Sequence, residues 1–379
     1  MAVINYITTI QFDFGAVGLL PQECERVGIS RPLVVTDAGV RAAGLLDRVL
    51  AKLGNSIPFQ VYDQTPPNPT ESAARDATAM YKEHDCDGVI AVGGGSPIDL
   101  AKAVALSATH EGPLRTYAAV EGGTARITPK VAPVIAVPTT AGTGSEVGRG
   151  SMMILDDGRK TGLLSPHLVP KSAICDPELT FGLPPHLTAA TGMDAISHCI
   201  ETFLAPAFNP PADGIVLDGL ERGWRYIAQA THEPDNREAR LNMMSAAMQG
   251  AMAFQKGLGC VHSLSHSIGA LNPRLHHGTL NAVLLPAVIE FNSSAPTVVA
   301  DRRMERIARA MGLENEAAVT PAIRDMTKRL GLPSGLRELD ITPSMFPQII
   351  DGALKDHTHK TNPREATASD YEAMLTASL

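Results

Sequence analysis

Two pairs of side chains in the second half of the chain have the spacing of metal ligands on helices. Asp194 and His198 lie four positions apart, and His262 and His266 repeat this spacing. Four residues make just over one helical turn, so both members of a pair point to the same side of a helix. Two further histidines follow in the segment LHHG. A single helical histidine is usually a core or surface residue, but this repetition favours a metal site. A carboxylate with several imidazoles suits a divalent transition metal such as Fe²⁺ or Zn²⁺.

A glycine-rich segment in the first half could bind a phosphate group. Gly93, Gly94, Gly95 and Ser96 stand between the apolar run GVIAV and the helical stretch PIDLAKAVAL. Glycines let the backbone approach a phosphate, and a helix N-terminus supplies free N–H groups and partial positive charge. The segment lacks the GxGxxG pattern of the standard dinucleotide fold. A tight strand-to-helix turn without a ligand is the alternative, although three consecutive glycines exceed what a turn needs.

Two other features favour a dinucleotide. The segment PTTAGTGSE at 138–146 follows another apolar run, and its hydroxyls and glycines could line a cofactor or form a plain surface loop. Asp37 follows the apolar run at 33–36, where an acidic residue bonds the adenine ribose and repels a 2′-phosphate. It could equally be a turn-forming aspartate. As a cofactor contact it favours NAD over NADP. A metal and a nicotinamide together indicate hydride transfer from an alcohol whose pKa the cation lowers.

The elements expected before residue 182 alternate between strands and helices. This alternation predicts a mostly parallel sheet with helices on both faces. The expected strands are 33–36, 58–62, 88–92 and 134–137, and the expected helices are 40–53, 70–84 and 97–107.

Helical patterns dominate the rest of the chain. We therefore expect an α/β dinucleotide-binding domain at 1–181 and an all-helical metal-binding domain at 182–379, with a ligand in the cleft between them. The expected helices are 187–204, 214–230, 237–256, 263–271, 280–291, 300–311 and 317–330.

Composition narrows the function classes. The 379 residues carry a formal net charge of -8, so nothing attracts the chain as a whole to nucleic acid or an anionic membrane. The five cysteines are widely spread without a CxxC pair, which is typical of reduced thiols. No signal peptide and no apolar run of membrane-spanning length is evident. We therefore expect a cytoplasmic protein.

Taken together, these motifs resemble the iron-containing alcohol dehydrogenase family over essentially the whole chain. The segments that carry the resemblance are FDFGAVGLL, VVTDAGV, DGVIAVGGGSPIDLAKAVAL, AVPTTAGTGSEV, DPELT, TGMDAISHCIETFL, FQKGLGCVHSLSHSIGAL, HHGTLNAVLLP and TNPREAT. The resemblance implies a dinucleotide-binding α/β domain followed by a helical metal domain of dehydroquinate synthase-like architecture, with the active site between them. It also implies NAD, one divalent metal, most often Fe²⁺, a small alcohol or aldehyde as substrate, and at least a homodimer.

The resemblance also implies roles for individual residues. Its metal ligands fall on Asp194, His198, His262 and the histidine of an HG pair, which is His277 here. The usual spacing is one residue shorter, so His276 stays an alternative. His266 matches a histidine that is not a ligand and helps proton movement. The implied cofactor contacts are Asp37, Gly94, Gly95, Ser96, Asp99, Thr139, Thr140, Thr143, Lys160 and Leu179.

Two departures from the family pattern bear on the substrate. Gly148-Arg149-Gly150 replaces a common threonine after TGSEV, and Thr358 stands where a cysteine is frequent. Within the family, the chain is most similar to the 4-hydroxybutyrate dehydrogenases, on GSEVGRG, ETFLAPAFNPPADGIVLDGLERGW and DHTHKTNP. A carboxylate substrate needs a cation, for which Arg149 is the first candidate and His359 and Lys360 are reserves. Arg149 could instead be a surface residue in a turn.

Other functions compete with this interpretation. A generic primary-alcohol dehydrogenase of the same family would differ in substrate preference. A maleylacetate reductase-like enzyme would dispense with the metal ligands, which are present here. A dehydroquinate synthase-like lyase should carry basic residues near the metal helices, and the stretch 187–204 has none. A non-catalytic metal-binding protein would have no affinity for NAD.

Overall fold

The computed structural model of the chain describes residues 8–54 and 57–379. By its internal contacts the chain divides into two compact units. Of the described residues, the sheet unit contains those from 8 to Thr140 together with Ser145–Gly182, and the helical unit contains Ala141–Gly144 together with Leu183–Leu379. The short segment Ala141–Gly144 thus belongs to the same unit as helices that follow it in the sequence. No feature of the sequence predicts this assignment.

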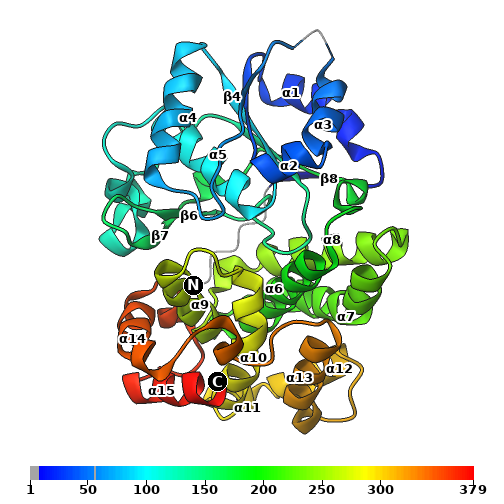
Figure 1. Cartoon of the computed structure of the whole chain (residues 1–379), viewed down its shortest axis with the longest axis vertical. Helices are drawn as coiled ribbons and strands as arrows, with labels where there is room; N and C mark the ends of the chain where they lie inside the picture. The colour runs from blue at the N-terminus through cyan, green and yellow to red at the C-terminus, as the bar shows by residue number, and fades with distance from the viewer. Residues whose placement is uncertain (1–7, 55–56) are drawn as a thin grey trace. The chain divides into compact units, whose positions relative to one another are not determined.

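The sheet unit is built on a six-stranded sheet whose strands are all parallel (Figure 1). The order across the sheet is β1-β8-β5-β4-β2-β3. Parallel strands need both faces covered, so the inner strands are continuously apolar rather than alternating. The strands are β1 (Thr9–Phe12), β2 (Pro32–Val35), β3 (Gln60–Tyr62), β4 (Gly88–Gly93), β5 (Val134–Pro138) and β8 (Ser172–Cys175).

Alternate residues of β2, β4 and β5 enter two different cores. Leu33 and Val89 belong to the core that includes α4 (Glu71–Glu83) and α5 (Gly95–Ser107). Val34 and Ile90, their neighbours in sequence, belong to the core that includes α1 (Leu20–Val27) and α3 (Leu45–Leu53). This period of two places helices on both faces of the sheet.

A small hairpin completes the sheet unit. Its strands, β6 (Gly150–Ile154) and β7 (Lys160–Leu164), pair in antiparallel register. The segment Ser145–Gly148 leads into β6 from the loop after β5, so the hairpin is a direct continuation of the threonine- and glycine-rich segment.

The helical unit is organised around α6, which is buried over almost its whole length. It packs against α7, α8 and α10. The helices of this unit are α6 (Pro185–Leu204), α7 (Pro210–His232), α8 (Arg237–Met252), α9 (Cys260–Leu271), α10 (His277–Asn292), α11 (Pro296–Ala300), α12 (Arg303–Ala310), α13 (Val319–Arg329), α14 (Phe346–Lys355) and α15 (Ala368–Ala377).

The fold class predicted from the sequence, a parallel α/β unit followed by helices, is confirmed. One expected helix, 40–53, is wrong in detail, because the chain breaks into α2 (Ala38–Ala42) and α3 at Gly44. Gly44 has φ +71°, a left-handed conformation that few other residues adopt. The expected helix 237–256 ends early at Met252, and 300–311 begins late at Arg303. The sequence also left β1, β8, the hairpin and helices α1, α11, α14 and α15 unpredicted.

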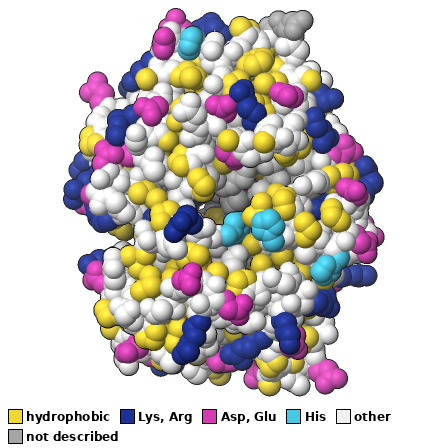
Figure 2. Space-filling view, in the orientation of Figure 1, with side chains coloured by type: hydrophobic (Ala, Val, Ile, Leu, Met, Phe, Trp, Pro, Cys, Tyr) yellow, Lys and Arg dark blue, Asp and Glu magenta, His cyan; other side chains and the backbone are white. Residues whose placement is uncertain are grey.

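The surface and the cysteines agree with the composition. On the face drawn in Figure 2, acidic and basic side chains are intermixed rather than gathered in one large area of one sign. All five cysteines lie within the described residues, where each is a buried free thiol. Within 8–54 and 57–379, no helix has the length and apolarity to cross a membrane.

Candidate metal centre and cofactor loops

The α6 helix carries the first two predicted metal ligands on one face. Asp194 and His198 are both buried, and His198 Nε2 lies 3.5 Å from Asp194 Oδ1. A buried carboxylate is costly unless it is paired or coordinates a cation. The helix thus presents an oxygen and a nitrogen that need a positive partner.

Two further imidazoles meet the same carboxylate oxygen. His262 from α9 and His277 from α10 place their Nε2 atoms 3.7 Å and 3.8 Å from Asp194 Oδ1. Ligands about 2.1 Å from a tetrahedral cation lie roughly 3.4 Å from one another. Asp194, His198 and His262 form a group that could hold a metal ion, and the Nε2 of His277 lies beside the same carboxylate oxygen.

A close approach of two helices sets the position of His277. Gly278 lies where α10 begins against α6, and a Cβ built on it would stand 2.1 Å from the carbonyl oxygen of Ala190. Only glycine permits this contact, which brings the first residue of α10 next to Asp194. The side chain of His276 is exposed just before the helix begins, whereas His277 is partly buried.

The surroundings of the candidate ligands shift their pKa values and so set their protonation states. Burial acts to raise the pKa of Asp194, but the surrounding imidazoles hold it well below its ordinary value. Burial lowers the pKa of His198 to about 4, although Asp194 opposes the shift. For His262, burial acts to lower the pKa, but the Glu201 and Asp194 carboxylates outweigh it and raise the pKa to about 9. A carboxylate and a neutral imidazole are the forms that bind a cation.

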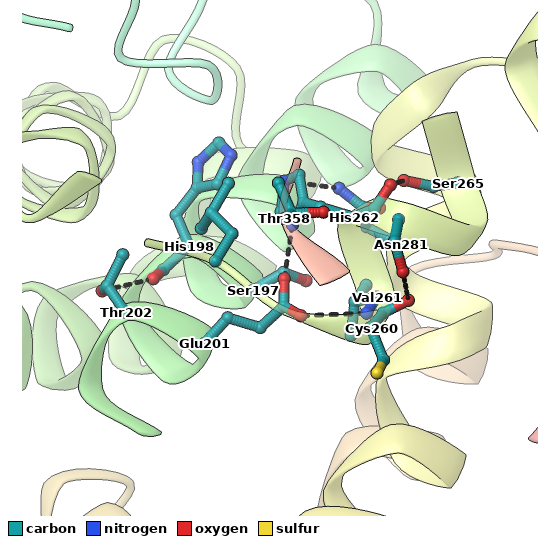
Figure 3. Close-up of polar contacts among 12 residues, drawn as sticks. Ser197, His198, Glu201, Thr202, Cys260, Val261, His262, Ser265, Asn281 and Thr358 are labelled. Atoms are coloured by element: carbon teal, nitrogen blue, oxygen red, sulfur yellow. Dashed lines mark hydrogen bonds and ion pairs between the residues drawn. The ribbon is translucent and has the colours of Figure 1, made fainter. Parts of the chain in front are cut away.

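Two residues of the site were not found from the sequence. Glu201 of α6 accepts a hydrogen bond from His262 Nδ1 through Oε2 and one from the backbone N–H of Val261, at 2.9 Å, through Oε1 (Figure 3). Asn281 of α10 donates from Nδ2 to Asp194 Oδ1 at 2.7 Å. Glu201 is seven residues after Asp194 and Asn281 is four after His277, so helical spacing from a ligand was the available signal.

The predicted proton-handling histidine lies beside the ligands. His266 Nδ1 is 3.0 Å from Asp356 Oδ2, and its ring stacks on that of His277 with centroids 5.3 Å apart. Thr358 donates from its backbone N–H and its hydroxyl to the other oxygen of Asp356, at 2.8 Å and 2.6 Å. Asp356 is a third contact that the sequence did not reveal, because it lies 90 residues from His266.

The predicted cofactor loops lie at the carboxyl ends of neighbouring strands. Asp37 follows β2, Gly94–Ser96 follows β4, and Thr139 and Thr140 follow β5. In parallel sheets this edge is where nucleotides bind. A Cβ built on Gly94 would lie 3.3 Å from the Thr140 side chain, so the last two loops are in contact.

Several predicted cofactor residues have partners within the fold. Asp37 Oδ1 caps α2 by accepting from the N–H of Val40 at 2.9 Å, and Ser96 Oγ donates to the carbonyl of Pro67. Lys160 Nζ donates to Asn68 Oδ1 at 2.9 Å.

Of two more of these residues, one is partly buried and one is deeply buried. Asp99 accepts from Ser145 Oγ at 2.6 Å and from the N–H of Met152 at 3.0 Å. Leu179 is 1% exposed within the core. Thr143 belongs to the helical unit rather than the sheet unit.

A buried lysine that the sequence did not single out holds the segment after the second loop. Lys102 of α5 donates from Nζ to the carbonyls of Ser145, Gly148 and Gly150, at 2.7 Å, 2.9 Å and 2.7 Å, and to Ser145 Oγ at 2.7 Å. Burial lowers the pKa of Lys102 to about 8, although Asp99 opposes the shift. The lysine fixes the backbone on both sides of Arg149.

The predicted substrate residues differ in their surroundings. Arg149 is exposed, and its guanidinium has no acidic partner in the part of the chain that the structure describes. His359 is half-buried, and its Nδ1 lies 2.9 Å from the hydroxyl of Tyr371. Lys360 beside it is exposed. Arg149 and Lys360 are therefore freer than His359 to meet a carboxylate.

Comparison with known proteins agrees with this geometry. The family model described as "Iron-containing alcohol dehydrogenase" matches residues 8–177. The model described as "Fe-containing alcohol dehydrogenase family, C-terminal" matches residues 188–379. The chain is 64% identical over 383 residues to the 4-hydroxybutyrate dehydrogenase of Cupriavidus necator, with 100% of both chains covered.

Solved structures agree as well. A 1,3-propanediol oxidoreductase has a TM-score of 0.94 and 33% identity, with 100% of both chains covered. The sulfoacetaldehyde reductase of Bifidobacterium kashiwanohense, in complex with NAD+, has a TM-score of 0.89 and 28% identity, covering 100% of this chain and 99% of that one.

The parallel sheet, the helical unit and the buried aspartate–histidine group define a metal-binding oxidoreductase that acts on CH–OH groups. The chain belongs to the iron-containing alcohol dehydrogenase family, and the resemblance seen in its sequence is confirmed.

Proposed function

We propose that the chain is an NAD-linked, metal-dependent dehydrogenase that interconverts 4-hydroxybutyrate and succinic semialdehyde. The observation that carries the proposal is the 64% identity, over the full length of both chains, to the 4-hydroxybutyrate dehydrogenase of Cupriavidus necator. The buried group of Asp194, His198 and His262 adds the chemistry that such a reaction needs.

The metal site takes one divalent cation, Fe²⁺ first and Zn²⁺ second, held by Asp194, His198, His262 and His277. A bound cation supplies Lewis acidity, which lowers the pKa of an alcohol hydroxyl. Asp194 offers the negative charge of the ligand set, and its Oδ1 lies within 3.8 Å of all three Nε2 atoms. The side chain of His277 is 30% exposed, while the other three are nearly closed to solvent, so substrate approaches from the side of His277.

The cofactor is NAD, bound at the carboxyl ends of β2, β4 and β5. Asp37 bonds the ribose hydroxyls and repels a 2′-phosphate, while the N-terminus of α5 at Gly94–Ser96 receives the pyrophosphate. The other contacts expected there are Asp99, Thr139, Thr140, Thr143, Lys160 and Leu179. The NAD+ complex of the sulfoacetaldehyde reductase supports this choice.

His266 carries the alcohol proton toward solvent. Its ring lies beside His277 but is not needed to complete a four-ligand set. The hydrogen bond to Asp356 orients the ring and makes Nδ1 the donor, and an imidazole held in this way is suited to proton transfer near neutral pH. We further expect at least a homodimer, as is usual in the family.

The far end of the substrate is a carboxylate, three carbons from the carbon that loses hydride. A carboxylate left without a partner in a closed site would be strongly disfavoured. Arg149 meets it, because its guanidinium has no acidic partner among the described residues and Lys102 holds the backbone around it. His359 and Lys360 are the reserve cations.

Steady-state kinetics with NAD after anaerobic loading with Fe²⁺ tests the proposal. We expect kcat/KM for 4-hydroxybutyrate to exceed that for butan-1-ol. Arg149→Ala should lower kcat/KM for the acid about 10- to 100-fold, the cost of losing a charged hydrogen bond, with little change on butan-1-ol. Arg159→Ala is the matched control, because Arg159 is exposed in the same unit but paired with Asp157. Equal kcat/KM for both substrates in the wild type would instead indicate a generic primary-alcohol dehydrogenase.

A further inference from the structure

Glu201 is a buried carboxylate on the ligand face of α6. It is 3% exposed and lies three residues after His198 and seven after Asp194, so the three side chains follow one side of the helix. A carboxylate this deeply buried needs hydrogen-bond donors to offset the loss of water. Both of its oxygens find their donors on a different helix, α9 (Figure 3).

One oxygen of Glu201 caps that helix. The residue before α9, Gly259, has no side chain that could satisfy the free N–H groups of the first turn. Glu201 Oε1 accepts from the N–H of Val261 at 2.9 Å, and Asn362 Oδ1 accepts from the N–H of Cys260 at 3.1 Å. The carboxylate thereby fixes the position of α9 relative to α6.

The other oxygen of Glu201 selects the form of a metal ligand. Oε2 accepts from His262 Nδ1, so that nitrogen carries the hydrogen. In a neutral imidazole the second nitrogen, Nε2, then keeps its lone pair, and it is this atom that lies 3.7 Å from Asp194 Oδ1. A carboxylate behind a ligating histidine fixes the ring tautomer and its orientation.

We propose that Glu201 is a positioning residue of the metal centre, which sets both the tautomer of His262 and the register of its helix. The proposal rests on the metal site of the proposed function. Helix position and ligand chemistry then depend on one side chain, because α6 supplies Asp194, His198 and Glu201 while α9 supplies His262. Loss of the carboxylate lowers metal affinity even where the fold is kept.

The Glu201→Gln substitution separates the two roles. Glutamine keeps an oxygen that can accept from the N–H of Val261, so α9 stays capped. Its amide N–H₂ replaces Oε2 and is a donor, which cannot accept from His262 Nδ1. With the amide in this orientation, the imidazole must turn away or move its hydrogen to Nε2, and neither form binds a cation.

The measurement is the Zn²⁺ affinity of the full chain, by competition with a chromophoric chelator, alongside the free energy of unfolding of the metal-free protein in urea. Glu71→Gln is the matched control. Glu71 is also a buried glutamate that accepts from two backbone N–H groups, of Leu114 at 2.9 Å and Asp156 at 3.1 Å, but it belongs to the sheet unit. We expect E201Q to bind Zn²⁺ about 10- to 100-fold more weakly than the wild type. E71Q should bind as the wild type does, and both variants should lose similar stability.

Wild-type affinity in E201Q would overturn the proposal and leave Glu201 a helix cap. A wild type that binds no Zn²⁺ would refute the metal site itself, which is a separate failure. If E201Q proves too unstable to titrate, Glu201→Asp replaces it, and the readout becomes the rise in Tm on adding Zn²⁺. That rise should be smaller than in the wild type, and an equal rise would count against the proposal.

Discussion

The most demanding prediction concerns Lys102, whose ammonium group lies inside the sheet unit with four acceptors. Replacing it by methionine keeps most of the side-chain volume but leaves the carbonyls of Ser145, Gly148 and Gly150 without this donor. Each buried carbonyl left unsatisfied costs about 1–3 kcal/mol. The substitution also removes a charge that burial disfavours, as the lowered pKa of Lys102 indicates. This gain offsets part of the stability that is lost with the hydrogen bonds.

We therefore expect Lys102→Met to lose about 3 kcal/mol, which corresponds to a fall in Tm of roughly 6–12 °C for a unit of this size. Differential scanning calorimetry of the full chain at neutral pH measures the shift. Lys130→Met, on an exposed lysine, should change stability by no more than about 0.5 kcal/mol. A K102M protein within about 1 kcal/mol of the wild type would refute the role given to these hydrogen bonds.

Four other predictions concern ligands, cofactor, proton transfer and pH. His277→Ala should lose more bound metal than His276→Ala by elemental analysis, and the reverse order would make His276 the fourth ligand. The wild type should have a higher kcat/KM with NAD than with NADP, and Asp37→Gly should reduce the ratio of the two values. A wild type that prefers NADP would refute this role for Asp37. His266→Ala should keep its metal but lose about 10²–10⁴-fold in kcat and change its pH profile, whereas an unchanged profile would make His266 structural. Burial raises the pKa of Glu146 to about 7 from 4.5, so its ionisation costs stability as pH rises through that interval. The free energy of unfolding in urea should therefore rise for Glu146→Gln relative to the wild type between pH 5 and pH 8. A difference between the two proteins that does not change with pH would contradict the raised pKa.

The elements predicted from the sequence are those with a long or strongly apolar pattern. The helix 70–84 was predicted almost to the residue, because Thr70 caps it and the apolar period is regular. The strand β1 was missed because TIQF is short and only partly buried. The strand β8 has just four residues, SAIC, with no alternation to distinguish it from a loop. Short strands gain their stability from neighbours in the sheet, which a local pattern does not contain.

The candidate site shows the same limit. Asp194 and His198 are visible in the sequence because helical spacing alone brings them together. Glu201 and Asp356 were not predicted, since they act on histidines that lie 61 and 90 residues away. The spacing of Glu201 from Asp194 fits one face of a helix, but the histidines that Glu201 and Asp356 contact are brought to them by the packing of helices.

The central claim, that a single cation held by Asp194 and three histidines enables hydride transfer to NAD, is tested most directly by titrating Fe²⁺ anaerobically into the metal-free chain. The rate of NADH formation from 4-hydroxybutyrate is followed together with the bound iron. We expect the rate to rise in proportion to bound iron and to stop rising at one ion per chain, while His198→Ala shows neither bound iron nor turnover. Full turnover in the metal-free chain, or full iron occupancy in H198A, would contradict the claim.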